Sequence, residues 1–257
     1  MDDTQKLLVE IQDGVKRITF NRPDRRNAVD GETQELLQKA IFDSAEDGSR
    51  VIVLTGSGDA FCSGADLQSM SGSGIKNTDV TALLRTGTNR TVLAMRKLPI
   101  PIIARIHGHA VGVGCSYALA CDLLIASDQA KFGQGFVKIG LMPDGGPTYF
   151  LPRAIGYARA FELAATGDII SAEQALALGL INRVVPVHEL DASVNQLAAK
   201  LAVGAPIALA KIKEGLNSGL TSDLAGALDF EAVNQDACFR SADFAEGVAA
   251  FLEKRKP

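Results

Sequence analysis

The chain has 257 residues, of which 47% are hydrophobic and 22% are charged, and its formal net charge at pH 7 is −4. This length predicts one large domain with a substantial core, and the slightly acidic balance excludes a general attraction for nucleic acid or for an anionic membrane. The four cysteines show no Cys-x-x-Cys pair and no metal-ligand spacing, and the N-terminal segment is unlike a signal peptide, so we expect a cytoplasmic protein with free thiols and no bound metal.

In chain order, strand and helix patterns alternate over the first two thirds of the sequence. The Asp-Gly pair at 13–14 predicts a hairpin within residues 7–20, and apolar residues at helical spacing predict a helix over 32–47. Prolines and charges interrupt the apolar run at 98–127, which excludes a membrane span. We expect further strands at 50–56, 101–108 and 123–127 and helices at 79–97 and 111–122.

The last third of the sequence is almost entirely helical in pattern. After the segment 171–185, helices are expected at 188–203, 205–219 and 222–253. Strands that alternate with helices favour βαβ units with right-handed connections. The sequence therefore predicts a superhelical α/β core over residues 1–190 and a helical region over residues 191–257.

Two glycine-rich loops follow buried strands, at 56–67 and 108–115. Neither has the spacing of a Walker-type phosphate loop or of a dinucleotide-binding turn. One hypothesis is that a backbone N–H group from each loop converges on one carbonyl oxygen, with glycines at 64, 112 and 114 permitting a close approach. The other is that these glycines only allow tight packing of strand on helix. The local pattern leaves both open.

Several segments in register resemble the crotonase superfamily, the enoyl-CoA hydratases and isomerases. They are "ITFNRPDRRNAV", "VIVLTGSGDAFCSGADL", "IIARIHGHAVGVGCSYALACDLLIASDQAKFGQ", "KIGLMPDGGPTYFLPRAIG" and "SAEQALALGLINRVVP". The resemblance implies a β-β-α superhelix with a helical C-terminal trimerisation region, in a homotrimer or a hexamer of two trimers. It also implies an acyl-CoA thioester substrate, with coenzyme A as part of the substrate and no further cofactor or metal.

The resemblance also implies roles for individual residues. The backbone N–H groups of Ala65 and Val113 correspond to the donors of the oxyanion hole, and valine supplies this N–H where many members have glycine. The remaining residues implied to contact coenzyme A are Arg26 and Ala28 at its entrance, Ala65, Asp66 and Leu67 at the adenine, and Phe251 and Lys254 towards the coenzyme A of a neighbouring subunit. Within that loop, Asp66 is interpreted as structural, through hydrogen bonds to the backbone.

The two glutamates that activate water in typical hydratases of this superfamily are absent. Ser116 and Phe136 stand in their places, and we expect both to lie in the substrate pocket. Asp144 lies in "MPDGG", which by itself predicts a turn. In this register, however, isomerases place their single acid/base there, and "KIGLMPDGG" followed by "LPR" resembles the ring-epoxide isomerase of bacterial phenylacetate degradation.

The sequence thus predicts an acyl-CoA isomerase that shifts a double bond or rearranges a ring through an enolate, with Asp144 as acid/base. An enoyl-CoA hydratase in which Asp144 directs water is one alternative. A non-catalytic acyl-CoA-binding or scaffold member of the superfamily is another. Residues 68–97 are expected to shape the acyl pocket, and the Ser-Gly-Ser-Gly run at 71–74 predicts a mobile segment.

Other polar residues near the two loops have plainer interpretations. His107 and His109 point to opposite faces at the end of a strand and are interpreted as structural. Cys62 and Cys115 are interpreted as packing residues. Ser116 is not part of a Gly-x-Ser-x-Gly elbow, which argues against a serine nucleophile.

Overall fold

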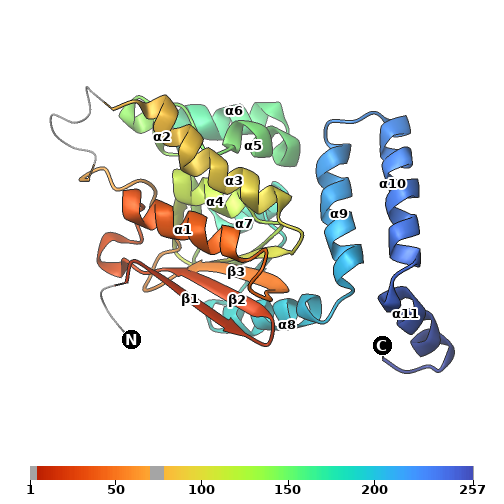
Figure 1. Cartoon of the computed structure of the whole chain (residues 1–257). Coiled ribbons are helices and arrows are strands. Elements are labelled where there is room, and N and C mark those ends of the chain that lie inside the picture. The colour runs from red at the N-terminus through yellow and green to blue at the C-terminus, as the bar shows by residue number, and fades with distance from the viewer. Residues whose placement is uncertain (1–4, 70–77, 257) are drawn as a thin grey trace.

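The computed structural model describes residues 5–69 and 78–256. The Ser-Gly-Ser-Gly run at 71–74, predicted to be a mobile segment, lies outside these residues. Figure 1 shows a layered core in which helices cover both faces of a sheet, with the last helices set to one side. The mixed α/β architecture confirms the predicted fold class.

The main sheet, within the described residues, has the strand order β1-β2-β3-β4-β6-β9. Its strands are β1 (Leu7–Gln12), β2 (Val15–Phe20), β3 (Val51–Gly56), β4 (Ile102–Ile106), β6 (Leu123–Ser127) and β9 (Arg183–Val185). The first pair is antiparallel and the others are parallel. The predicted hairpin is confirmed, because Asp13 and Gly14 have φ of 51° and 75°, the left-handed pair that a type I′ turn requires.

The central strand β3 shows how both faces of this sheet are buried. Val51 and Val53 belong to an apolar cluster with α8 (Leu190–Ala202), which lies beneath the sheet in Figure 1. The alternate residues Ile52 and Leu54 point to the other face and belong to the larger cluster. That cluster includes side chains of α1 (Gly31–Asp43), α3 (Thr88–Lys97) and α4 (Val113–Ala120). A strand buried on both faces is expected to be a continuous apolar run, as residues 51–54 are.

A second sheet, in the same described part of the chain, was not predicted. Its strands β5 (His109–Val111), β7 (Lys131–Gly133) and β8 (Ile169–Ser171) have three residues each, too few to produce a recognisable alternation. The remaining elements of the core are the short helices η1 (Pro23–Arg25), η3 (Phe136–Ile139) and η4 (Val187–Glu189) and the helices α5 (Pro147–Ile155), α6 (Tyr157–Thr166) and α7 (Ala172–Ala177).

Two of the predicted helices are interrupted. The helix expected at 79–97 is divided into α2 (Val80–Thr86) and α3, because Gly87 leaves the helical region with φ −99° and ψ −100°. The helix expected at 222–253 is divided into α10 (Leu224–Phe239) and α11 (Ala242–Leu252). There Ser241 begins a new helix, its hydroxyl accepting a hydrogen bond from the Phe244 N–H.

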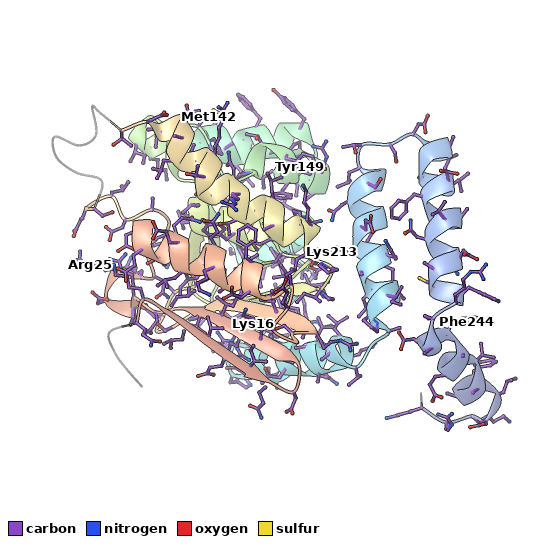
Figure 2. All side chains as sticks on the ribbon, viewed as in Figure 1. Lys16, Arg25, Met142, Tyr149, Lys213 and Phe244 are labelled. Carbon is purple, nitrogen blue, oxygen red and sulfur yellow. The ribbon has the colours of Figure 1, made fainter. Side chains whose placement is uncertain are left out.

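The arm formed by α9 (Pro206–Gly219), α10 and α11 lies beside the core in Figure 1. The buried side chain of α9 is Lys213, which Figure 2 labels between the core and α9. Its Nζ donates to the Met95 and Ile100 carbonyls at 2.8 and 3.0 Å and lies 2.8 Å from a carboxylate oxygen of Asp122. A polar anchor therefore joins the arm to the core. Within residues 5–69 and 78–256, no helix is long and apolar enough to cross a membrane.

Candidate active site

The two glycine-rich loops lie side by side. The Cys62 N–H donates to the His109 carbonyl at 2.9 Å, and the Val111 N–H donates to the Cys62 carbonyl at 3.0 Å. A Cβ atom placed on Gly64 would lie 3.8 Å from the Cα of Gly112. Both glycines have a φ that L-residues rarely adopt, +110° and +55°. The loops thus touch where side chains are absent from both.

The two proposed N–H donors lie directly after these glycines. Ala65 N–H donates no hydrogen bond within the described part of the chain, whereas the adjacent Asp66 N–H donates to the Val29 carbonyl at 2.9 Å. Val113 is the first residue of α4, and N–H groups in the first turn of a helix lack acceptors within that helix. Gly114 has another purpose, since a Cβ there would lie 2.5 Å from the Cys62 carbonyl oxygen. The packing hypothesis is therefore confirmed for Gly114, and the approach of a ligand to Gly64 and Gly112 stays a prediction.

Asp144 lies in the turn between η3 and α5, two residues after Met142 in the sequence. Its side chain is half-buried, and its carboxylate has neither a hydrogen-bond donor nor a cation among residues 5–69 and 78–256. Burial raises the pKa of this carboxyl above its ordinary value, because desolvation disfavours the charged form. An acid with a raised pKa and no partner is suited to taking and returning a proton.

The turn that carries Asp144 rests on α4. The Ser116 hydroxyl donates to the Asp144 carbonyl at 2.7 Å. A Cβ placed on Gly145 would lie only 2.9 Å from the Cβ of Ser116. Ser116 follows Val113 by three residues, which is about one helical turn. The structure therefore attaches the acid to the helix whose first residue supplies a proposed oxyanion donor.

The two positions that lack the hydratase glutamates are both buried. Ser116 has no exposed surface, and Phe136 is 8% exposed. The Phe136 ring reaches within 4.0 Å of where a Cβ on Gly112 would lie, so it borders the second glycine-rich loop. Of these two positions and Asp144, only the last has a carboxylate.

Another carboxylate of the first glycine-rich loop, that of Asp66, accepts several hydrogen bonds. It accepts hydrogen bonds from Arg22 Nη2 at 2.7 Å and from the Gln68 N–H at 3.1 Å. The Arg22 guanidinium holds the pKa of this carboxyl below its ordinary value. Arg22 was not predicted as a site residue, although it lies in the "NRPDRRNAV" segment. Asn27 was missed as well; its amide donates to the Ser57 and Ala60 carbonyls at 2.8 and 2.7 Å.

The residues expected near coenzyme A fall into two groups. In the first group, the segment of Arg26 and Ala28 packs against the first glycine-rich loop, where the Ser63 N–H donates to the Arg26 carbonyl at 3.0 Å. Arg26 is exposed and so is Leu67, which lies further along that loop. The second group is Phe251 and Lys254, at the end of the arm, which Figure 1 shows apart from the core. Within one chain, the residues of the second group therefore lie apart from those of the first group.

His107 and the two cysteines are enclosed by protein groups, whereas His109 is exposed on β5. His107 lies between the Arg105 guanidinium, 2.8 Å from Nδ1, and the Gly58 carbonyl, 3.0 Å from Nε2. Burial raises the pKa of the Cys62 and Cys115 thiols to about 12, so neither is reactive at neutral pH. Among the described residues, no three His, Cys, Asp or Glu side chains gather as a metal site.

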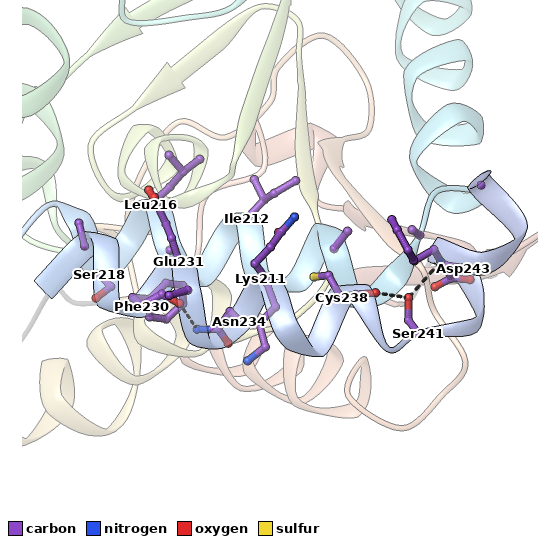
Figure 3. A pocket seen from close by; sticks show the side chains of 18 of the residues that line it. Lys211, Ile212, Leu216, Ser218, Phe230, Glu231, Asn234, Cys238, Ser241 and Asp243 are labelled. Atoms are coloured by element: carbon purple, nitrogen blue, oxygen red, sulfur yellow. Dashed lines mark hydrogen bonds between the residues drawn. The ribbon is translucent and has the colours of Figure 1, made fainter. Parts of the chain in front are cut away.

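A separate groove of about 1330 Å³ lies along the arm, between α9 and the pair α10 and α11. Figure 3 shows Ile212 and Leu216 of α9 on one side and Phe230 and Cys238 of α10 among the lining residues. None of the residues that line it belongs to the loops or the turn described above. The groove is therefore distinct from the Asp144 site.

Comparison with known proteins gives a consistent result along the chain. The family model described as Enoyl-CoA hydratase/isomerase matches residues 10–257. A Rhodobacter capsulatus protein named "Probable enoyl-CoA hydratase" is 41% identical, over 96% of this chain and 95% of the relative. The 1,2-epoxyphenylacetyl-CoA isomerase of Escherichia coli is 39% identical, over 98% of this chain and 97% of the relative.

Solved structures agree with these relatives. The crystal structure of enoyl-CoA hydratase from Bacillus anthracis superposes with a TM-score of 0.93 at 36% identity, covering 98% of each chain. The names of the relatives include both hydratases and isomerases, so the similarity specifies the family and leaves the reaction open. The match over almost the whole chain and the shared fold show that this chain belongs to the enoyl-CoA hydratase/isomerase family, within the crotonase superfamily.

Proposed function

We propose that the protein is an acyl-CoA isomerase that shifts a double bond, or rearranges a ring, in an enoyl-CoA thioester through an enolate. Asp144 is the acid/base, and the backbone N–H groups of Ala65 and Val113 form the oxyanion hole. The observation that supports this most is the Asp144 carboxylate, which is half-buried and has no partner within the described residues.

The proposed chemistry uses one carboxylate and two N–H groups. Removal of a proton next to the thioester places negative charge on the thioester oxygen, which the two donors stabilise. Each donor contributes a factor of about 10² to 10³ in rate, and a positioned base contributes about 10² to 10⁴. The carboxylic acid formed on Asp144 then returns the proton to another carbon, so that substrate and product have the same atoms. Such a transfer requires no redox group or metal ion.

Hydration is the second candidate, and it is favoured by the hydratase names among the relatives. Addition of water requires a carboxylate that orients and deprotonates the water molecule. The hydroxyl of Ser116 and the ring of Phe136 do not provide a carboxylate at the two hydratase positions, so Asp144 is the carboxylate available for either reaction. Typical hydratases of the superfamily use two glutamates, whereas the proposed proton transfer uses one carboxylate. We therefore favour isomerisation.

Coenzyme A is proposed to bind along the first glycine-rich loop. The peptide of residues 65–67 holds the adenine, and Arg26 and Ala28 line the entrance. The hydrogen bonds between this loop and the segment 22–28 support the placement, because they keep both sides of the entrance together. Phe251 and Lys254 contact the coenzyme A of a neighbouring subunit.

The neighbouring subunit implies self-association through the region 191–257, as a homotrimer or a hexamer of two trimers. Large apolar side chains on the arm support this proposal, since Leu216 is 70% exposed and Phe251 82% exposed. Light scattering at micromolar concentration measures the mass; a monomer would contradict the proposal. A cytoplasmic location is also proposed, because the four cysteines are free thiols.

Product analysis separates the candidate reactions. The purified protein is given a 3-trans-enoyl-CoA, and we expect a conjugated 2-enoyl product, detected by its ultraviolet absorbance, without hydroxyacyl-CoA in the mass spectrum. Crotonyl-CoA is the control substrate, and its rapid hydration would favour the hydratase. If neither thioester reacts, a panel of aromatic, dicarboxylic and straight-chain enoyl-CoAs is tested next. A protein that converts none of them is a non-catalytic binding member of the family.

A further inference from the structure

The position of Ser116 in the middle of α4 is unusual for a hydroxyl side chain. It is fully buried, and a serine inside a helix ordinarily donates its one proton to the carbonyl four residues earlier. Here that acceptor, the Gly112 carbonyl, lies 3.3 Å away, whereas the Asp144 carbonyl lies 2.7 Å away. The shorter contact is outside the helix. The hydroxyl therefore connects α4 to the turn that carries the acid.

A second contact shows that the turn is closely seated on this residue. A Cβ placed on Gly145 would lie 2.9 Å from the Ser116 Cβ and 3.0 Å from the Thr88 Cγ2, at the beginning of α3. The backbone after Asp144 thus lies directly on two small side chains. A hydrogen bond and a steric contact together fix the height of the turn above α4.

We propose that Ser116 is a positioning residue, which sets the Asp144 carboxylate relative to the Val113 N–H. The inference rests on the proposed roles of these two groups. Ser116 contacts the backbone of the acid, and it lies about one helical turn after the donor. The hydroxyl therefore contributes to holding the base at the carbon and the oxyanion hole at the oxygen of one thioester.

Removal of this hydroxyl is expected to act on turnover. A displacement of about 1 Å in a catalytic group costs about 10²-fold in rate. We expect Ser116→Ala to lower kcat by about 10- to 100-fold and to change KM by less than about 3-fold, because the proposed coenzyme A contacts lie on other segments. Ser116→Thr retains a hydroxyl and is expected to restore most of kcat.

The matched control is Ser127→Ala in β6. Ser127 is also fully buried, and its Oγ has no hydrogen-bond partner within the described residues. This variant removes a buried oxygen of the same kind without touching the site, so its kcat is expected to equal that of the unmodified protein. Thermal unfolding of the three variants shows whether each is folded at the assay temperature.

The assay measures kcat for the thioester reaction, isomerisation or hydration, that is lost in Asp144→Asn. This variant is the reference for complete loss of the acid/base. The inference is overturned if Ser116→Ala keeps full kcat while Asp144→Asn has lost it. It is also overturned if the loss is confined to KM, if Ser127→Ala loses as much, or if a folded Ser116→Thr is as slow as Ser116→Ala. An active Asp144→Asn would instead remove the proposed function itself, and with it the role of Ser116.

Discussion

The loop around Asp66 and the turn around Asp144 place two carboxylates near the same pair of glycine-rich loops, and they treat them in opposite ways. Asp66 is 8% exposed and accepts hydrogen bonds from a guanidinium and from the backbone. Asp144 is half-buried without any donor in the described part of the chain. The partners of each carboxylate therefore indicate its role: the first holds a loop together, and the second is free to exchange a proton.

The pKa values of the two carboxyls follow this difference. The Arg22 guanidinium lowers the pKa of Asp66 by stabilising the charged form. Burial raises the pKa of Asp144, because no donor or cation among residues 5–69 and 78–256 replaces the water that the charged form loses. The same side chain is thus stabilised as an anion in one loop and is the proposed base in the neighbouring turn.

The largest effect is expected from Asp144→Asn. The amide cannot accept the proton in the reaction, so kcat is expected to fall by about 10² to 10⁴. The free energy of unfolding is expected to stay the same or to rise slightly, because the substitution removes a charge that burial disfavours. Steady-state kinetics and urea unfolding measure the two quantities. Full turnover by the folded variant would contradict the role of Asp144.

Asp66→Asn is the matched change in the other loop, and the expected pattern is reversed. Loss of the carboxylate removes the nearer of two ion-pair partners of the Arg22 guanidinium, which also lies 3.4 Å from the Asp30 carboxylate, and costs about 1 to 3 kcal/mol in the free energy of unfolding. We expect a raised KM for the thioester, since the loop borders the proposed coenzyme A entrance, and a kcat that falls far less than in Asp144→Asn. A stable variant with abolished turnover would reverse the assignment of the two carboxylates.

The turns that hold these residues can be predicted from the sequence, but the tertiary contacts of Asp66 and Ser116 cannot. The turn at Asp144 follows from Pro-Asp-Gly-Gly, and the hairpin at Asp13 follows from Asp-Gly, because both depend on neighbouring residues. The pairing of Asp66 with Arg22 joins residues 44 positions apart, which no local pattern encodes. The hydrogen bond of Ser116 is tertiary for the same reason.

The prediction of helix boundaries from the sequence was incomplete as well. The interruption at Gly87 was not predicted, because a single glycine within a helical pattern is ordinarily tolerated. Its consequence is local to the site, since the break allows α3 to begin at Thr88, against which Gly145 packs. The family resemblance predicted the role of Asp144, whereas the contacts of its turn with Ser116 and Thr88 are visible only in the structure.

The smallest expected effects are those of pH, and they separate the two carboxylates without altering the site. Asp144 must be deprotonated to act as base, so kcat/KM is expected to rise with pH through a midpoint above 3.8, the ordinary value for aspartate. For Asp66, the folded state has the lower pKa, so the unfolded state binds more protons as pH falls below 3.8. The stability that its ion pair contributes is therefore complete above 3.8 and is lost as pH falls through the lowered pKa.

Two pH profiles test the raised pKa of Asp144 and the lowered pKa of Asp66. The activity profile is measured on the unmodified protein over the range in which it remains folded, and an acidic midpoint at or below 3.8 would contradict a buried, unpaired Asp144. The stability profile compares the unmodified protein with Asp66→Asn by urea unfolding. Their difference in unfolding free energy is expected to narrow only below pH 3.8, because protonation of Asp66 then removes the same charge as the substitution. A difference that narrows at higher pH would mean that Arg22 does not hold Asp66 in its charged form.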